Sequence, residues 1–139
     1  MSGETLRQRR HRVLVVDDAS NMRDLLTVLL EVEDDFDVVG AVRDGAQAIE
    51  RAAELRPDFI LLDIAMPGMD GMAALPELRR LLPDSRIVVF SAFEEEELGE
   101  RALGHGADVY IEKGTSVTDL VDRLRALSRP DESTGGMPA

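Results

Sequence analysis

The sequence predicts an α/β fold, a doubly wound parallel sheet of five strands with helices on both faces. Short apolar runs rich in β-branched residues alternate with helix-like stretches between residue 12 and about residue 128. This alternation is typical of buried parallel strands joined by helices. The second run is the only one that does not end on a chemically active side chain, which suits an edge strand. These observations favour the flavodoxin-like strand order 2-1-3-4-5, in which sites form at the carboxyl ends of the strands.

The first half of the chain contains two strands and two helices. Residues 13–16 (VLVV) form the first strand, and Ser20 can cap the amphipathic helix that follows. Residues 37–42 form a weaker strand. An alanine-rich helix over residues 46–55 ends before Pro57, because proline cannot continue a helix.

The third strand, residues 59–62, is followed by a segment dense in turn residues. The sequence MPGMDG at residues 66–71 indicates that Asp63 opens a structured loop rather than a regular helix. The next helix reaches Leu82 and contains Pro76, which either lies in its first turn or kinks it.

The last part of the chain completes the alternation. A strand over residues 87–90 precedes an acidic helix over residues 94–103, and a fifth strand covers residues 109–112. Ser116 can cap the final helix, whose apolar residues lie on one face through position 127.

One domain is expected over residues 12–128, preceded by a flexible basic tail at residues 1–11 and followed by a disordered tail at residues 129–139. The formal net charge is −12; four arginines against one glutamate give residues 1–12 a charge of +3, which leaves −15 for the rest. A body this acidic repels phosphate backbones, so direct nucleic-acid binding is not expected. The closing RPDESTGGMPA resembles a linker as much as a terminus, and it cannot fold into an output domain.

The composition also indicates a compartment. There is no cysteine, which excludes disulfides and thiolate metal sites, and no apolar segment is long enough for a signal peptide or a membrane span. We expect a cytoplasmic protein without membrane contact.

Four of the five predicted strands end on polar side chains that can do chemistry. These side chains are Asp17 with Asp18, Asp63, Ser91 and Lys113, and the predicted topology brings them to one edge of the sheet. Lys113 is the only lysine in a chain with fifteen arginines. This bias indicates that a compact ammonium, rather than any cation, is needed at that position.

Three converging carboxylates favour Mg²⁺, a hard cation that keeps several waters and leaves room for phosphate oxygens. Lys113 and Ser91 would then meet the oxygens of a transferred phosphoryl group, and Asp63, alone on the central strand, would be the nucleophile. Taken singly, each residue has a plainer interpretation: an Asp pair forms a turn, a strand-end serine caps a helix, and a lysine lies at the surface. Their joint occurrence at four strand ends favours phosphoryl chemistry.

The motifs VLVVDD, LLDIAMPGMDG, FSA and YIEKG resemble those of the response-regulator receiver family of two-component signalling, over residues 12–127. The resemblance implies that Asp63 is the phosphoacceptor and also a ligand of Mg²⁺. It further implies that Asp18 binds the metal directly, that Asp17 does so largely through water, and that the backbone carbonyl of Ala65 completes the metal site.

The same resemblance implies the parts of a switch. Ser91, Ala92 and Lys113 would contact the phosphoryl group. Ser91 and Tyr110 would change conformation: when the Ser91 hydroxyl moves to the phosphate, the segment after it shifts and vacates space for the Tyr110 ring. The readout would be the face of the fourth helix, fifth strand and fifth helix. The acidic run Glu94–Glu97 is explained most simply as solvated charge at a helix N-terminus.

Some positions depart from the family pattern or vary within it. Gly114 follows Lys113 where many members have proline, so the geometry of that loop is open. Ala65 and Phe93 stand at positions that tune the lifetime of the phosphoryl group, and neither side chain can orient water through hydrogen bonds. We therefore expect slow self-dephosphorylation.

The sequence as a whole predicts a stand-alone phosphoacceptor switch. It would take its phosphoryl group from a sensor histidine kinase or a phosphotransfer protein and change its binding to a downstream protein, and it could form a homodimer. It is not expected to be an enzyme beyond catalysing its own phosphorylation and dephosphorylation. Two alternatives are a phosphorelay intermediate and the receiver fragment of a DNA-binding regulator, because the middle segments are most similar to receivers attached to helix-turn-helix domains.

Two other classes of protein are disfavoured. A haloacid-dehalogenase-like phosphatase would need a catalytic aspartate where Ala65 and Ala19 stand. A flavodoxin-type cofactor binder would need aromatic loops, and the chain has only four Phe, one Tyr and no Trp.

Overall fold

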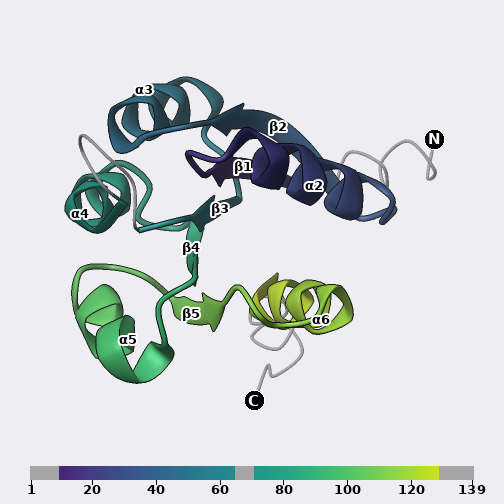
Figure 1. Ribbon diagram of the computed structural model, residues 1–139. Coiled ribbons are helices and arrows are strands. Elements are labelled where there is room, and N and C mark those ends of the chain that lie inside the picture. Colours follow the sequence, from purple (N-terminus) through teal and green to yellow (C-terminus); the bar gives the residue numbers. More distant parts are fainter. Residues whose placement is uncertain (1–9, 65–70, 129–139) are drawn as a thin grey trace, which may run out of the picture.

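The structure, a computed structural model, describes residues 10–64 and 71–128. Its centre is a five-stranded parallel sheet with the order β2-β1-β3-β4-β5, as the sequence predicted (Figure 1). The strands, in chain order, are β1 (His11–Val16), β2 (Phe36–Val42), β3 (Phe59–Leu62), β4 (Arg86–Ser91) and β5 (Val109–Glu112). The two expected tails and the expected MPGMDG loop lie outside the described residues, apart from positions 10, 11 and 71.

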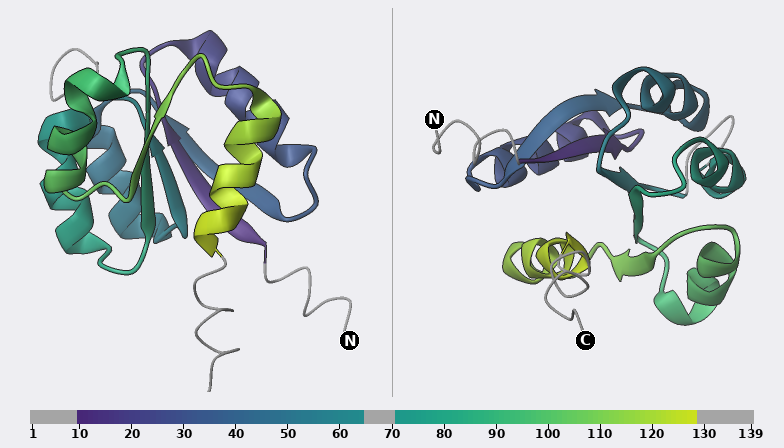
Figure 2. Two further views of the ribbon diagram at one scale, coloured as in Figure 1. Left: turned by 90° about the horizontal axis from the view of Figure 1, so that it is seen from below. Right: turned by 180° about the vertical axis from the view of Figure 1, so that it is seen from behind.

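Helices cover both faces of the sheet. In the described part of the chain they are α2 (Ser20–Glu31), α3 (Gly45–Leu55), α4 (Gly71–Leu81), α5 (Glu95–Gly104) and α6 (Val117–Ser128). Figure 2 shows α3, α4 and α5 on one face and α2 and α6 on the other, which confirms the doubly wound architecture. Among the described helices, none is long and apolar enough to cross a membrane.

The two helical layers follow from the alternation of side chains along each strand. Leu14 and Val16 belong to the core that includes residues of α3, α4 and α5, whereas Val13 and Val15 belong to the core that includes residues of α2 and α6. All four residues of β3 are buried. A continuous apolar run is what a central parallel strand requires, because helices cover both of its sides.

Two helices begin on a side chain that caps them. Asp44 starts α3 and Ser116 starts α6, each accepting a backbone N–H from three residues further on, at 2.8 and 3.2 Å respectively. The prediction for Ser116 is therefore confirmed. The prediction for Ser20 is wrong: α2 begins at Ser20, and its N-cap residue is Ala19. The physical reason lies in the preceding turn, where the Asp17 carboxylate accepts the Ala19 N–H at 3.0 Å.

The remaining element boundaries agree with the sequence expectation to within two residues. Pro76 lies inside α4, five residues after Gly71, so it does not occupy the first turn of the described helix. Its missing N–H removes one bond from the middle of α4.

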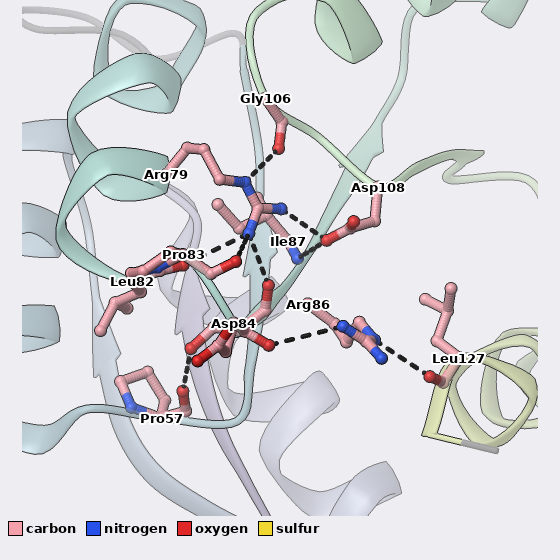
Figure 3. Close-up of polar contacts among 11 residues, drawn as sticks. Pro57, Arg79, Leu82, Pro83, Asp84, Arg86, Ile87, Gly106, Asp108 and Leu127 are labelled. Carbon is pink, nitrogen blue, oxygen red and sulfur yellow. Dashed lines mark hydrogen bonds and ion pairs between the residues drawn. The ribbon is translucent and has the colours of Figure 1, made fainter. Parts of the chain in front are cut away.

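An arginine holds together the amino edge of the sheet. Arg79, near the end of α4, donates to the carbonyls of Gly106 and Ser85 at 3.0 and 2.8 Å and to the carboxylate of Asp108 at 2.6 Å (Figure 3). The same Asp108 oxygen accepts the Ile87 N–H at 2.7 Å. Gly106 has φ +124°, and a Cβ there would press against Arg79. One guanidinium thus ties α4 to the loops that lead into β4 and β5.

A second arginine joins α6 to the loop before β2. Arg125 donates to both carboxylate oxygens of Asp35, at 2.7 and 2.8 Å, and to Glu33 at 2.8 Å. Its guanidinium carbon lies 5.8 Å from the centre of the Phe36 ring. The hydrogen bonds from Arg125 lower the pKa of Asp35, and they outweigh the effect of burial.

Replacing Arg125 with Met should lower the free energy of unfolding by about 1–2 kcal/mol, because the variant loses a bidentate ion pair and a cation–π contact. A lowered carboxyl pKa stabilises the fold above the ordinary value of 3.8. The loss should therefore shrink as the pH falls through the lowered pKa of Asp35. Urea unfolding across pH, with Arg123→Met as the exposed control on the same helix, measures both effects. Equal losses in the two variants would contradict this assignment.

Candidate functional site

Parallel pairing brings the four predicted strand ends to one edge of the sheet. Asp17 and Asp18 follow β1, Asp63 follows β3, Ser91 ends β4 and Lys113 follows β5. The backbone fixes their heights: the Asp63 N–H donates to the Val16 carbonyl at 2.9 Å, and the Lys113 N–H donates to the Ser91 carbonyl at 2.7 Å. The four strand ends therefore lie at one edge of the sheet, as the sequence predicted.

The three aspartates form a compact cluster. One carboxylate oxygen from each of Asp17, Asp18 and Asp63 lies within 4.8 Å of the others. Asp17 and Asp63 are only 2% and 5% exposed, whereas Asp18 is exposed to solvent. Hard carboxylate oxygens with one side open to water are the donor set that Mg²⁺ prefers, because this ion keeps part of its hydration shell. The residues present therefore fit the metal that the sequence predicted.

Lys113 places a positive charge among these carboxylates. Its Nζ lies 2.8 Å from Asp17 and 3.4 Å from Asp63. Burial disfavours the charged form of Lys113, but the hydrogen bond to Asp17 and the charges of Asp63 and Asp17 together outweigh it, so the pKa of Lys113 is raised. The ammonium is therefore charged at neutral pH. One ammonium against three carboxylates leaves an excess of negative charge that a divalent cation can neutralise.

Ser91 ends β4, and Tyr110 lies on the neighbouring strand β5, where its register partner is Val89. Ser91 is fully buried, and its Oγ accepts the Phe93 N–H at 3.2 Å; Ala92, between them, is exposed. The Tyr110 ring is also buried, and its hydroxyl donates to the Phe93 carbonyl at 2.7 Å. Burial raises the pKa of Tyr110. The Tyr110 ring thus already occupies an interior position, which the sequence expectation reserved for the phosphorylated state.

Three residues of the site escaped the sequence analysis. At Gly71, the first described residue of α4, a Cβ would collide with the Asp63 carbonyl oxygen, so only glycine allows this approach. Arg23 donates to the Asp17 carbonyl at 2.7 Å. Glu112 accepts the Glu95 N–H at 2.8 Å. Gly71 carried a usable signal as the end of a turn-rich motif, but the other two contacts depend on tertiary packing. The expected carbonyl ligand, Ala65, lies outside the described residues.

Comparison with known proteins agrees with this arrangement. The sequence model described as the response regulator receiver domain matches residues 13–125. The chain belongs to the response regulator receiver family. Members of this family are signalling proteins of two-component systems, in which they work with histidine kinases and downstream effectors.

Relatives with curated descriptions and solved structures extend the match. The response regulator protein VraR of Staphylococcus saprophyticus is 40% identical over 114 residues, which cover 82% of this chain and 54% of VraR. The response regulator domain of Thermotoga maritima CheB is 35% identical, with a TM-score of 0.78 over 85% of this chain and 96% of that domain. A LuxR-family DNA-binding response regulator from Staphylococcus aureus is 25% identical, with a TM-score of 0.77 over 84% and 97%. The chain spans about half the length of the curated relatives it matches.

The charge balance of the receiver site predicts opposite effects of two substitutions on stability without Mg²⁺. Lys113→Met should lower the free energy of unfolding by about 2 kcal/mol, because two buried carboxylates lose their cation. Asp63→Asn should raise it by about 1 kcal/mol, because it removes repulsion and leaves the Asp17–Lys113 pair intact. Chemical denaturation in a chelating buffer measures both. A destabilised Asp63→Asn variant would show that the cluster is not under electrostatic strain.

The burial of Tyr110 predicts that its phenol ionises at a higher pH in the folded protein than in the unfolded chain. It is the only tyrosine and there is no tryptophan, so phenolate absorbance reports this residue alone. Because its folded pKa is raised, the phenol should ionise in the native protein at a higher pH than in denaturant, where the ordinary value of about 10 applies. The stability that the neutral phenol confers should fall as the pH rises above that value. Identical titration curves in the native and denatured states would contradict the buried position.

Proposed function

We propose that this receiver is a phosphoacceptor switch in which Asp63 takes a phosphoryl group in the presence of Mg²⁺. The observation that supports this most is the cluster of Asp17, Asp18 and Asp63 with the ammonium of Lys113 beside it. The donor is a sensor histidine kinase or a phosphotransfer protein, as membership of the family suggests. An Asp63 carboxylate oxygen attacks phosphorus, the bond from phosphorus to the donor breaks, and an acyl phosphate forms on Asp63.

Asp17, Asp18 and Asp63 would hold Mg²⁺, and the Ala65 backbone carbonyl is proposed as a further ligand. When bound, the metal would neutralise charge on the phosphoryl oxygens. Lys113 supplies the positive charge from the chain itself. Its Nζ is 3.4 Å from Asp63, within reach of an oxygen of a phosphoryl group attached there. A lysine carries its proton at neutral pH, so Lys113 would act as a positive charge during the transfer.

The switch would run from Ser91 and Ala92 to Tyr110. The Ser91 hydroxyl accepts the Phe93 N–H in this structure, and it would turn its own proton toward a phosphoryl oxygen on Asp63. We propose that this turn, with contact to the Ala92 backbone, fixes the segment that also binds Tyr110 through the Phe93 carbonyl. The phosphorylated chain would then change its affinity for a downstream protein.

Phe93 bears on the lifetime of the phosphoryl group. Its side chain is 45% exposed next to Ser91 and carries no group that can orient an attacking water. Slow self-dephosphorylation therefore remains our proposal. The catalysis that we assign is confined to the chain's own phosphorylation and dephosphorylation, and we infer a cytoplasmic location from the family's partnership with kinases.

A second candidate function is the receiver part of a DNA-binding regulator. The length of the curated relatives favours it, since the match covers only 54–56% of each, and so does the likeness to a LuxR-family DNA-binding regulator. In that case residues 12–128 would be the regulatory domain, the two tails would be its flanking segments, and contact with DNA would come from elsewhere. A relay intermediate and a homodimer are compatible with the same receiver chemistry.

The proposed function predicts one phosphoryl adduct. Incubation with acetyl phosphate and Mg²⁺ should give a single acid-stable, base-labile adduct, which mass spectrometry after borohydride reduction locates at Asp63. Asp63→Asn should abolish it, and a chelator should prevent it. Asp58→Asn, an exposed aspartate at the opposite edge of the sheet, is the matched control and should behave like the natural sequence. An adduct that persists in Asp63→Asn would refute the assignment.

A further inference from the structure

The segment from Ser91 to Glu95, which joins β4 to α5, is held by residues at the end of β5. The Lys113 N–H donates to the Ser91 carbonyl at 2.7 Å, and the Tyr110 hydroxyl donates to the Phe93 carbonyl at 2.7 Å. The third contact comes from a side chain, because the Glu112 carboxylate accepts the Glu95 N–H at 2.8 Å. Residues 110–113, at the end of β5 and just after it, thus contact this segment at its start, middle and end.

Glu112 acts as a cap for α5 from a distant part of the chain. Glu94 occupies the N-cap position of α5, but its side chain makes no capping hydrogen bond. Helices usually satisfy their first N–H groups with a side chain from the N-cap position. Here Glu112, seventeen residues further along, accepts the N–H of the first helical residue. The first N–H of α5 is therefore capped by a side chain from β5 and not by the residue that precedes the helix.

The surroundings of Glu112 make this contact easy to break. Glu94, Glu95, Glu96 and Glu112 line one open hollow of about 540 Å³. Within residues 10–64 and 71–128, no ion pair joins any of these four to a basic side chain. Glu112 is held in place by the N–H of Glu95 and by the positive end of the helix dipole, against repulsion from its neighbours. The hydrogen bond between Glu112 and Glu95 is therefore opposed by repulsion between the Glu112 carboxylate and the neighbouring glutamates.

We propose that Glu112 is a positioning residue that couples the phosphorylation site to α5. It is adjacent to Lys113, whose Nζ contacts Asp63 and whose N–H holds the Ser91 carbonyl, so the residue that caps α5 and the residue beside the phosphorylation site share one strand end. By holding Glu95, Glu112 keeps the Ser91–Glu95 segment closed over the Tyr110 ring. The connection of this role to phosphate rests on the proposed function. The hydrogen bond between Glu112 and Glu95 does not depend on that function.

This role requires a side-chain oxygen at position 112 that can accept the Glu95 N–H, and it depends less on the negative charge. Glu112→Ala removes the cap, whereas Glu112→Gln keeps an acceptor oxygen and removes the charge. Glu96→Ala is the matched control, because it takes the same charge from the same hollow and leaves the hydrogen bond in place. Circular dichroism of each variant checks that it is folded, and folding is expected because Glu112 is exposed.

Acrylamide quenching of tyrosine fluorescence measures the closed state directly, since Tyr110 is the only tyrosine and no tryptophan is present. Loss of one helix cap should shift the ratio of open to closed segment by about fivefold, so Tyr110 in Glu112→Ala should be quenched more strongly than in the natural sequence. Glu112→Gln and Glu96→Ala should be quenched like the natural sequence. Unchanged quenching in Glu112→Ala would overturn the proposal, and so would an equal increase in Glu112→Gln or Glu96→Ala.

The coupling is measured by phosphorylation with acetyl phosphate. Because the proposed role of Glu112 is to hold the segment that carries Ser91 in place for the phosphoryl group, the Glu112→Ala variant should react more slowly at fixed Mg²⁺, by at most about fivefold, with Glu112→Gln close to the natural rate. If Glu112→Ala changed the quenching of Tyr110 but left the rate of phosphorylation unchanged, the proposed coupling between Glu112 and the phosphorylation site would be overturned. Quenching needs no phosphoryl group, so absence of any adduct in the natural sequence would refute the proposed function, while the capping role would still be decided by fluorescence.

Discussion

The ammonium of Lys113 between Asp17 and Asp63 is the interaction on which this site depends. Two buried carboxylates at neighbouring strand ends repel each other, and Lys113 lies 2.8 Å from one and 3.4 Å from the other. The sheet supplies this geometry, because β1, β3, β4 and β5 are parallel and deliver their last residues to one edge. A single point charge fits there without filling the space that ligands need. A planar, forked guanidinium is larger and would occupy more of it.

The two edges of the sheet use their cations differently. At the amino edge, Arg79 and Arg125 donate several hydrogen bonds each and fix loops and helix ends in one arrangement. At the carboxyl edge, the contacts of the Ser91, Tyr110 and Glu112 side chains are single hydrogen bonds. Multiple bonds to one guanidinium resist movement, whereas single bonds can be exchanged one at a time. The amino edge is therefore the more highly cross-linked of the two, which suits the switch that we propose at the carboxyl edge.

The sequence was sufficient for the features that follow from periodicity and strand order. Buried strands ending on Asp17, Asp63, Ser91 and Lys113 had to meet once the topology was recognised. It was not sufficient where a contact depends on which neighbour packs nearby. Serine is a residue type that often caps helices, yet at the start of α2 it is the Asp17 carboxylate that accepts a backbone N–H, that of Ala19. Glu112 looks in the sequence like an ordinary surface charge, yet its carboxylate accepts the N–H of Glu95, the first residue of a helix that begins seventeen residues earlier.

Asp17, Asp18, Asp63 and Lys113 are proposed to form one site for Mg²⁺ and a phosphoryl group. Amide NMR spectra recorded during addition of Mg²⁺, and then of beryllofluoride as a mimic of aspartyl phosphate, test it most directly. We expect Mg²⁺ alone to shift resonances at the ends of β1 and β3, and beryllofluoride to extend the shifts to Ser91, Lys113 and the first turn of α5. Saturable shifts confined to the amino edge of the sheet, or no saturable shift at all, would contradict it.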